Sequence, residues 1–252
     1  MKANVKEEKI RFVEPQESNY SSWTLIEGFP GMGLVGTIAV KYLSEKLDFK
    51  ENGFIESGMF LPVLRIHNGL PVHPARIYTS KKHRIILLIS EQIIPQKQTY
   101  DLAKAVIEWI NKKKITRVIS LAGIRAPNAK EGMLFGIAAN AQSKKTLKDW
   151  KVQLIDEGIT TGITAFILLN LSKENVDAFS LLGNAKTDAD YRAAADVIKK
   201  LDEMYPDFEI DVKPLLQEAK KTEEDILKHL QQLKEKVPGL DQVEKPSTPM
   251  YA

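Results

Sequence analysis

Hydrophobic positions along the chain form short apolar runs that alternate with longer segments of helical spacing. Residues 85–89 are apolar throughout, as expected for a strand that is covered on both faces. A helix is expected over 98–112, because Leu102, Val106 and Trp109 recur there at helical spacing. This alternation predicts an α/β fold whose sheet is mostly parallel or mixed and carries helices on both sides.

The middle of the chain departs from this alternation. Between residues 53 and 90, extended segments follow one another without a helix, which predicts an antiparallel insertion. These segments cover 54–60, 63–66, 72–79 and 84–90. Further strands are expected at 10–13, 23–29, 115–122, 134–138, 152–155 and 176–182, and further helices at 34–47, up to 150, at 162–171 and at 188–205.

The last forty residues have a different pattern from the rest. Residues 212–237 place apolar side chains on one face and charges opposite, which predicts a long C-terminal amphipathic helix. That face either folds back on its own core or packs between subunits. Residues 238–252 contain Pro246 and Pro249 and no apolar periodicity, so we expect a flexible tail. The expected organisation is a single α/β core domain over 1–211, followed by this helix and this tail.

Composition narrows the class of protein. The 252 residues are 43% hydrophobic and 27% charged, which suits a globular protein. The chain contains no cysteine, which excludes disulfides, thiolate catalysis and cysteine-based metal sites. The net charge of +3 is small, and the lysines of the chain are scattered among acidic residues, so we expect no nucleic-acid binding. Without a signal-peptide pattern or a long apolar run, we expect a cytoplasmic protein with no membrane contact.

One glycine-rich turn matches a known ligand-binding pattern. Gly31-x-Gly33-x-x-Gly36 has the spacing of the dinucleotide-binding fingerprint, and Glu56 follows about twenty residues later. Against a cofactor site, Pro30 removes an amide donor at the entry to the turn and stiffens it.

The alternative interpretation of this turn is structural. Glycines there would let the turn close and let the following helix pack tightly on the sheet. This interpretation, which we favour, implies no bound cofactor. It assigns the turn to Gly28, Pro30, Gly31, Gly33 and Gly36.

Other reactive side chains form no recognisable catalytic constellation. The four histidines are not at metal-ligand spacing, and no nucleophile-elbow motif occurs. The histidines are His67, His73, His83 and His229, and we expect His67 and His73 to be solvated at the ends of a hairpin around Gly69. The acids Glu91, Asp156 and Glu157 follow expected strands, where α/β enzymes place their sites, but we interpret them as turn-forming because no cation or histidine cluster converges on them. The same interpretation applies to Arg125 and Asn128 in the polar loop after the strand expected at 115–122.

Taken together, several segments resemble the proteasome-assembly chaperone family, which includes archaeal members. The similarity extends over about residues 20–205 and is carried by several separate motifs. They are Trp-Thr-Leu-Ile-Glu-Gly-Phe-Pro-Gly-Met-Gly-Leu-Val-Gly at 23–36, Gly-Ile-Thr-Thr-Gly at 158–162, Val-Asp-Ala-Phe-Ser-Leu-Leu at 176–182 and the helix at 188–201.

The resemblance implies both a fold and a role. The fold would be an α/β/α sandwich similar to purine nucleoside phosphorylases, without their active site and without a cofactor. The protein would be a non-catalytic homo-oligomer, a tetramer or a pentamer, that assists proteasome assembly or activation. The family's contact motif is a C-terminal hydrophobic residue, a tyrosine and any residue, which here corresponds to Met250, Tyr251 and Ala252.

These C-terminal residues would bind the proteasome α-ring through its α-subunits, or another assembly factor. A free carboxylate at Ala252 can pair with a lysine, while Tyr251 and Met250 fill an apolar pocket. Two alternatives remain: a nucleotide- or dinucleotide-binding enzyme that uses the turn at 31–36, and a scaffold that assembles through the helix at 212–237.

Overall fold

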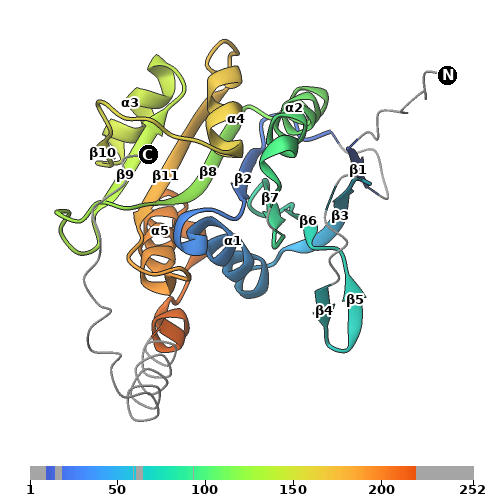
Figure 1. The fold of residues 1–252 in the computed structure, drawn as a ribbon, viewed down its shortest axis with the longest axis horizontal. Coiled ribbons are helices and arrows are strands. Elements are labelled where there is room, and N and C mark those ends of the chain that lie inside the picture. The colour runs from blue at the N-terminus through green and yellow to red at the C-terminus, as the bar shows by residue number, and fades with distance from the viewer. Residues whose placement is uncertain (1–9, 15–18, 59, 61–64, 93, 220–252) are drawn as a thin grey trace, which may run out of the picture.

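A nine-stranded mixed sheet organises the molecule (Figure 1). The computed structural model describes residues 10–14, 19–58, 60, 65–92 and 94–219. Across the sheet the strands follow the order β1-β3-β6-β7-β2-β8-β11-β9-β10. Their bounds are β1 Arg11–Val13, β2 Thr24–Gly28, β3 Lys50–Glu56, β6 Ala75–Ser80, β7 Ile85–Ser90, β8 Arg117–Ile124, β9 Leu134–Ala138, β10 Gln153–Leu154 and β11 Asp177–Asn184.

The centre of the sheet is parallel and its two sides are not. Strands β7, β2, β8 and β11 are parallel neighbours, and both β2 and β7 are buried along their whole length. On one side, β6, β3 and β1 continue the sheet in antiparallel pairs. On the other side, β9 is antiparallel to β11 and parallel to β10. The mixed sheet predicted from the sequence is therefore confirmed.

Helices cover both faces of the sheet and enclose two apolar cores. The first core lies beneath α1, α3 and α5, where Leu43, Leu147 and Ile198 meet the sheet. The second core lies beneath α2 and α4, where Trp109 and Ile167 meet the other face. This arrangement confirms the predicted α/β/α sandwich. The helix bounds are α1 Val35–Lys46, α2 Gln96–Lys113, α3 Ala141–Asp149, α4 Ile163–Leu171 and α5 Tyr191–Met204.

Side-chain caps fix the beginnings of two helices. The Asn140 side chain accepts a hydrogen bond from the Ser143 amide in a reciprocal capping box that begins α3. The Asp190 side chain accepts from the Ala193 amide and begins α5. The helix expected from residue 188 therefore begins at 191, because Asp190 is its cap.

A two-stranded hairpin lies outside the main sheet. It consists of β4 (Arg65–His67) and β5 (Leu70–Val72), and it projects from the β3–β6 side of the molecule (Figure 1). The single strand expected at 72–79 is thus two strands. They are separated at Pro74, which cannot donate to a strand ladder.

The C-terminal prediction falls largely outside the described residues. Residues 213–219 are helical, and Leu215 and Ala219 are buried. Most of the helix expected over 212–237, and all of the tail expected over 238–252, lie beyond the part of the chain that the structure describes. Within that part, every helix is too short or too polar to cross a membrane.

Candidate functional site

The glycine-rich turn brings α1 into direct contact with the sheet. A Cβ atom on Gly36 would lie 2.0 Å from the carbonyl oxygen of Leu121 in β8. A Cβ atom on Gly28 would lie 2.2 Å from the carbonyl oxygen of Gly36. Real Cβ contacts are not this short, so the close packing of α1 on β2 and β8 requires glycine at both positions.

The middle glycine meets another part of the same chain. Gly33 has a φ of 62°, its Cβ position lies 2.6 Å from the Ala185 side chain, and its carbonyl accepts from the Asp190 amide. Gly31, in contrast, is extended, and among the described residues a Cβ there would meet only the Phe29 carbonyl oxygen, 4.0 Å away. In a dinucleotide site the pyrophosphate lies close to the backbone of the turn, because glycine has no side chain there. In this protein the loop before α5 lies against Gly33 instead, which favours the structural interpretation.

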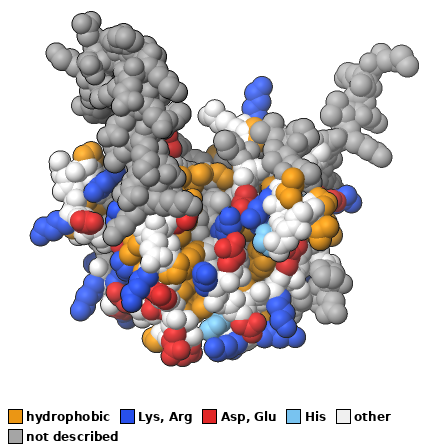
Figure 2. Space-filling view, turned by 90° about the horizontal axis from the view of Figure 1, so that it is seen from below, with side chains coloured by type: hydrophobic (Ala, Val, Ile, Leu, Met, Phe, Trp, Pro, Cys, Tyr) orange, Lys and Arg blue, Asp and Glu red, His pale blue; other side chains and the backbone are white. Residues whose placement is uncertain are grey.

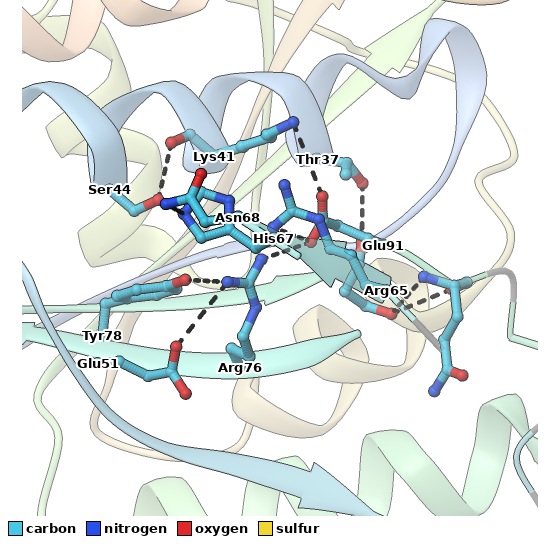
Figure 3. A network of polar contacts seen from close by, with 12 residues as sticks. Thr37, Lys41, Ser44, Glu51, Arg65, His67, Asn68, Arg76, Tyr78 and Glu91 are labelled. Carbon is cyan, nitrogen blue, oxygen red and sulfur yellow. Dashed lines mark hydrogen bonds and ion pairs between the residues drawn. The ribbon is translucent and has the colours of Figure 1, made fainter. Parts of the chain in front are cut away.

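A cluster of charged side chains connects the hairpin to the body of the molecule (Figure 3). Glu91, which follows β7, pairs with Arg65 of the hairpin at 3.0 Å and with Lys41 of α1 at 3.9 Å. It also pairs with Arg76 of β6. Arg76 is buried, and on its other side it contacts Glu51 and the Tyr78 hydroxyl. Burial raises the pKa of Tyr78, while the nearby Arg76 lowers it.

Sequence reasoning missed this cluster and treated Glu91 as a turn-forming acid. Its cations come from three separate elements, so no spacing in the sequence indicates them. The antiparallel pairing of β6 and β7 places Arg76 opposite Ile89, beside Glu91. Figure 2 shows the surface at this end of the molecule, where acidic and basic side chains alternate with apolar ones.

A second acid lies in the core. Glu27 of β2 is fully buried, and among the described residues neither of its carboxyl oxygens has a hydrogen-bond partner. Burial raises the pKa of Glu27 from 4.5 to about 7. The nearby Ser120 hydroxyl and Phe29 amide lower this pKa in part, although neither reaches hydrogen-bond geometry.

The remaining polar candidates lie apart from one another. His73 stacks on Phe54 at 3.6 Å, and His83 meets Phe208 edge-on. No group of three or more metal-binding side chains occurs among the described residues. Other candidates are placed without converging: His67 lies in the hairpin, Asp156, Glu157, Arg125 and Asn128 are exposed in loops, and His229 lies outside the described residues.

An apolar surface lies on the outer side of α4. This helix has almost no polar side chains, and Leu169 is 65% exposed on it. Ile159, in the loop before α4, is 87% exposed, and Tyr100 of α2 packs edge-on against Phe166. Helices that are apolar all round are normally covered on every side. We call this group, Tyr100, Ile159, Phe166 and Leu169, the α4 surface.

The predicted partner-binding residues Met250, Tyr251 and Ala252 lie outside the described residues. Their proposed contact with a partner therefore stays a prediction.

Comparison with known proteins identifies the family. The profile of the PAC2 family matches residues 25–230. An uncharacterized protein of Methanocaldococcus jannaschii is 30% identical over 217 residues, covering 86% of this chain and 89% of the relative. Two structures from Pyrococcus furiosus are also similar. PbaA, described as an archaeal homolog of proteasome-assembly chaperone, has a TM-score of 0.78 and 31% identity, covering 90% of this chain and 94% of PbaA.

PbaB, described as an archaeal proteasome activator, has a TM-score of 0.74 and 20% identity, covering 89% of this chain and 99% of PbaB. At 20% identity, the similarity to PbaB shows a shared fold. The profile match spans most of the chain and agrees with the glycine-rich turn and the α/β/α layers described above. The chain therefore belongs to the PAC2 family.

Proposed function

We propose that this protein is a non-catalytic chaperone or activator that binds the proteasome α-ring through its C-terminal residues. The observation that carries the proposal is the likeness to PbaA, which extends over 90% of the chain at 31% identity. PbaA is described as a homolog of a proteasome-assembly chaperone, and the same fold occurs in the activator PbaB. The glycine-rich turn supports the non-catalytic part of the proposal, because the loop before α5 lies against Gly33, where a nucleotide phosphate would approach.

The C-terminal residues have suitable chemistry for docking. The Ala252 carboxylate would pair with a lysine of the partner, while Tyr251 and Met250 would enter an apolar pocket. Burial of these two side chains contributes about 3–4 kcal/mol, and the charged hydrogen bond about 1.5–3 kcal/mol. Association entropy costs at least about 4 kcal/mol, so a single tail would bind only weakly.

Weak single contacts imply that several tails act together. Linking them in one oligomer would strengthen binding by about a hundredfold or more through effective concentration. We therefore propose that the protein is a homo-oligomer. The α4 surface supports this part of the proposal, because exposed apolar side chains that gather on one apolar helix are typical of protein interfaces.

Removing the tail tests the docking mechanism. Deletion of Met250–Ala252 should abolish binding to the 20S proteasome, measured by surface plasmon resonance, and leave the thermal midpoint and oligomer mass unchanged. A matched control scrambles residues 244–248, which keeps the chain length and its last residues, and should bind like the wild type. Equal binding by the truncated protein would show that the tail is not the contact.

The alternative, a nucleotide-binding enzyme, rests on the literal match of Gly31-x-Gly33-x-x-Gly36 between β2 and α1. It predicts that NAD, ATP or a nucleoside raises the thermal midpoint. At a hundred times its dissociation constant, a ligand stabilises by about 2.7 kcal/mol. A thermal-shift series with these compounds separates the two functions, since our proposal predicts no shift.

A further inference from the structure

A basic cleft lies away from the hairpin and the glycine-rich turn. Its volume is about 610 Å³, and it is lined by residues of the loop before β9, the end of α3, the turn into β10 and the middle of α5. Four lysines and one glutamate contribute its charged groups: Lys130, Lys148, Lys151, Lys200 and Glu131.

Most of this positive charge is uncompensated. Within the described parts of the chain, Lys130, Lys148 and Lys151 have no carboxylate at ion-pair distance. Lys200 pairs with Glu203, which leaves Glu131 as the acid that opposes the other three lysines inside the cleft. Behind the wall, the Asp196 carboxylate lies near Gly132 but pairs with Lys199 at 3.4 Å. The cleft therefore attracts anions.

The lysines are attached to an ordered part of the backbone. The Lys151 amide donates to the Lys148 carbonyl at 2.9 Å, and the Val152 amide donates to the Leu147 carbonyl at 3.0 Å. These hydrogen bonds close the end of α3 and hold two of the lysines on one tight turn. A ligand would therefore meet amines whose attachment points are already fixed, which lowers the entropic cost of binding.

Apolar side chains lie between the charged groups. Met133, Leu134 and Val152 line the cleft, and the last two are more than nine-tenths buried. The site thus combines an apolar floor with amines above it. Its ligand should carry both negative charges and an apolar group.

These features favour an acidic peptide over other anions. The described residues of the lining include no aromatic side chain, whereas single-stranded nucleic acid is usually bound by stacking its bases on aromatic rings. The lining is also larger and more apolar than a site for a phosphate ion needs. An extended segment with acidic side chains around an apolar one matches the lysines and the floor together.

We propose that this cleft binds an acidic segment of a partner protein, with carboxylates on Lys130, Lys148 and Lys151 and an apolar side chain over Leu134 and Val152. The proposal is independent of the C-terminal residues and of their docking.

Charge reversal at the end of α3 and in the turn after it tests this proposal with a matched control. The probe is a fluorescein-labelled peptide of alternating glutamate and leucine, and its anisotropy is measured with the full-length protein at near-physiological ionic strength, where charges more than about 8 Å apart are largely screened. The variant K148E/K151E should weaken binding at least about tenfold, because two attractions become repulsions. The control K144E/K145E makes the same charge change on exposed residues of α3 outside the cleft and should change the affinity less than about twofold.

Further variants and competitors give independent readings. K130E, in the loop before β9, should also weaken binding, which guards against misfolding of the double variant. A glutamine–leucine peptide should bind much more weakly, and neither inorganic phosphate nor an oligonucleotide should displace the probe at equal concentration. The proposal would be overturned if both double variants lost the same affinity, or if the wild type did not bind the probe. It would also be overturned if the glutamine–leucine peptide bound as tightly as the probe, or if phosphate or the oligonucleotide displaced the probe.

Discussion

At the scale of single residues, the glycine-rich turn shows how one hydrogen atom decides the packing of a helix. Gly36 lies where α1 crosses β8, and the backbone on both sides of the contact is fixed by regular structure. A methyl group there has no space to enter. The same turn contains Gly31, whose extended backbone and open surroundings accept a side chain.

Substitution of these two glycines therefore has opposite consequences. Gly36→Ala should lower the free energy of unfolding by about 3 kcal/mol or more, because α1 must move away from the sheet. Gly31→Ala should change it by less than about 0.5 kcal/mol. Urea denaturation of both variants checks the pair. A stable Gly36→Ala protein would contradict the packing described here.

Glu27 makes stability depend on pH. Its pKa is about 7 in the folded protein and 4.5 when unfolded, so the folded state keeps a proton that the unfolded state releases. Stability from this group is therefore lost as pH rises from 4.5 to about 7, by up to about 3 kcal/mol. Glu27→Gln should remove this loss.

The substitution is tested by urea denaturation at about pH 5 and about pH 8. The free energy of unfolding of Glu27→Gln, taken relative to that of the wild type at the same pH, should be clearly higher at about pH 8 than at about pH 5. The control Glu108→Gln changes an exposed glutamate of α2 and should show little such dependence. The same difference at both values would show that Glu27 does not titrate in this range.

Single residues also mark the limits of sequence reasoning. The glycine spacing is visible in the sequence, but whether a phosphate or the protein's own loop meets Gly33 depends on residues 185–190, far away in the chain. Glu91 meets its cations only after β6 and β7 pair and the hairpin folds back. Contacts of this kind leave no local pattern.

At the scale of elements, hydrophobic periodicity predicted most helices and the central strands. It works there because α2 and α5 bury one face and β7 buries both. It was less accurate in the antiparallel insertion. The strand expected at 54–60 begins at Lys50, because the exposed, charged start of β3 lacks an apolar signal. The hairpin was merged in part with β6, because its apolar residues Ile66 and Leu70 are exposed rather than buried.

The ion cluster at the base of the hairpin should stabilise it. An isolated two-stranded hairpin is only marginally stable, and Arg65 connects this one to Glu91. Arg65→Ala should increase hydrogen exchange across 65–72 and leave exchange in β7 unchanged. The control Arg11→Ala removes an exposed ion pair with Glu56 and should leave the hairpin unaffected. Unchanged exchange in Arg65→Ala would show that the hairpin is held without this ion pair.

At the scale of the whole molecule, the α4 surface should be an interface between copies of the chain. Leu169→Asp places a charge on this surface and should shift the protein toward monomers in analytical ultracentrifugation, because burying an unpaired charge is costly. Asn170→Asp adds the same charge one position along, at a polar exposed residue, and serves as the control. An oligomer equally stable in Leu169→Asp would place the interface elsewhere.

At this scale the fold and the family could be predicted from the sequence, whereas the basic cleft could be found only in the structure. The α/β/α sandwich follows from alternating patterns and is confirmed, and the family follows from motifs spread over the chain. The basic cleft was not predicted, because its lysines come from segments as far apart as Lys130 and Lys200 and look scattered in the sequence.

The most direct test of the proposed function is to mix the purified protein with isolated proteasome α-subunits and measure the masses of the complexes by native mass spectrometry. We expect a complex that contains both proteins and that disappears when residues 250–252 are removed. Masses of the separate proteins alone, at concentrations where the oligomer is intact, would contradict it.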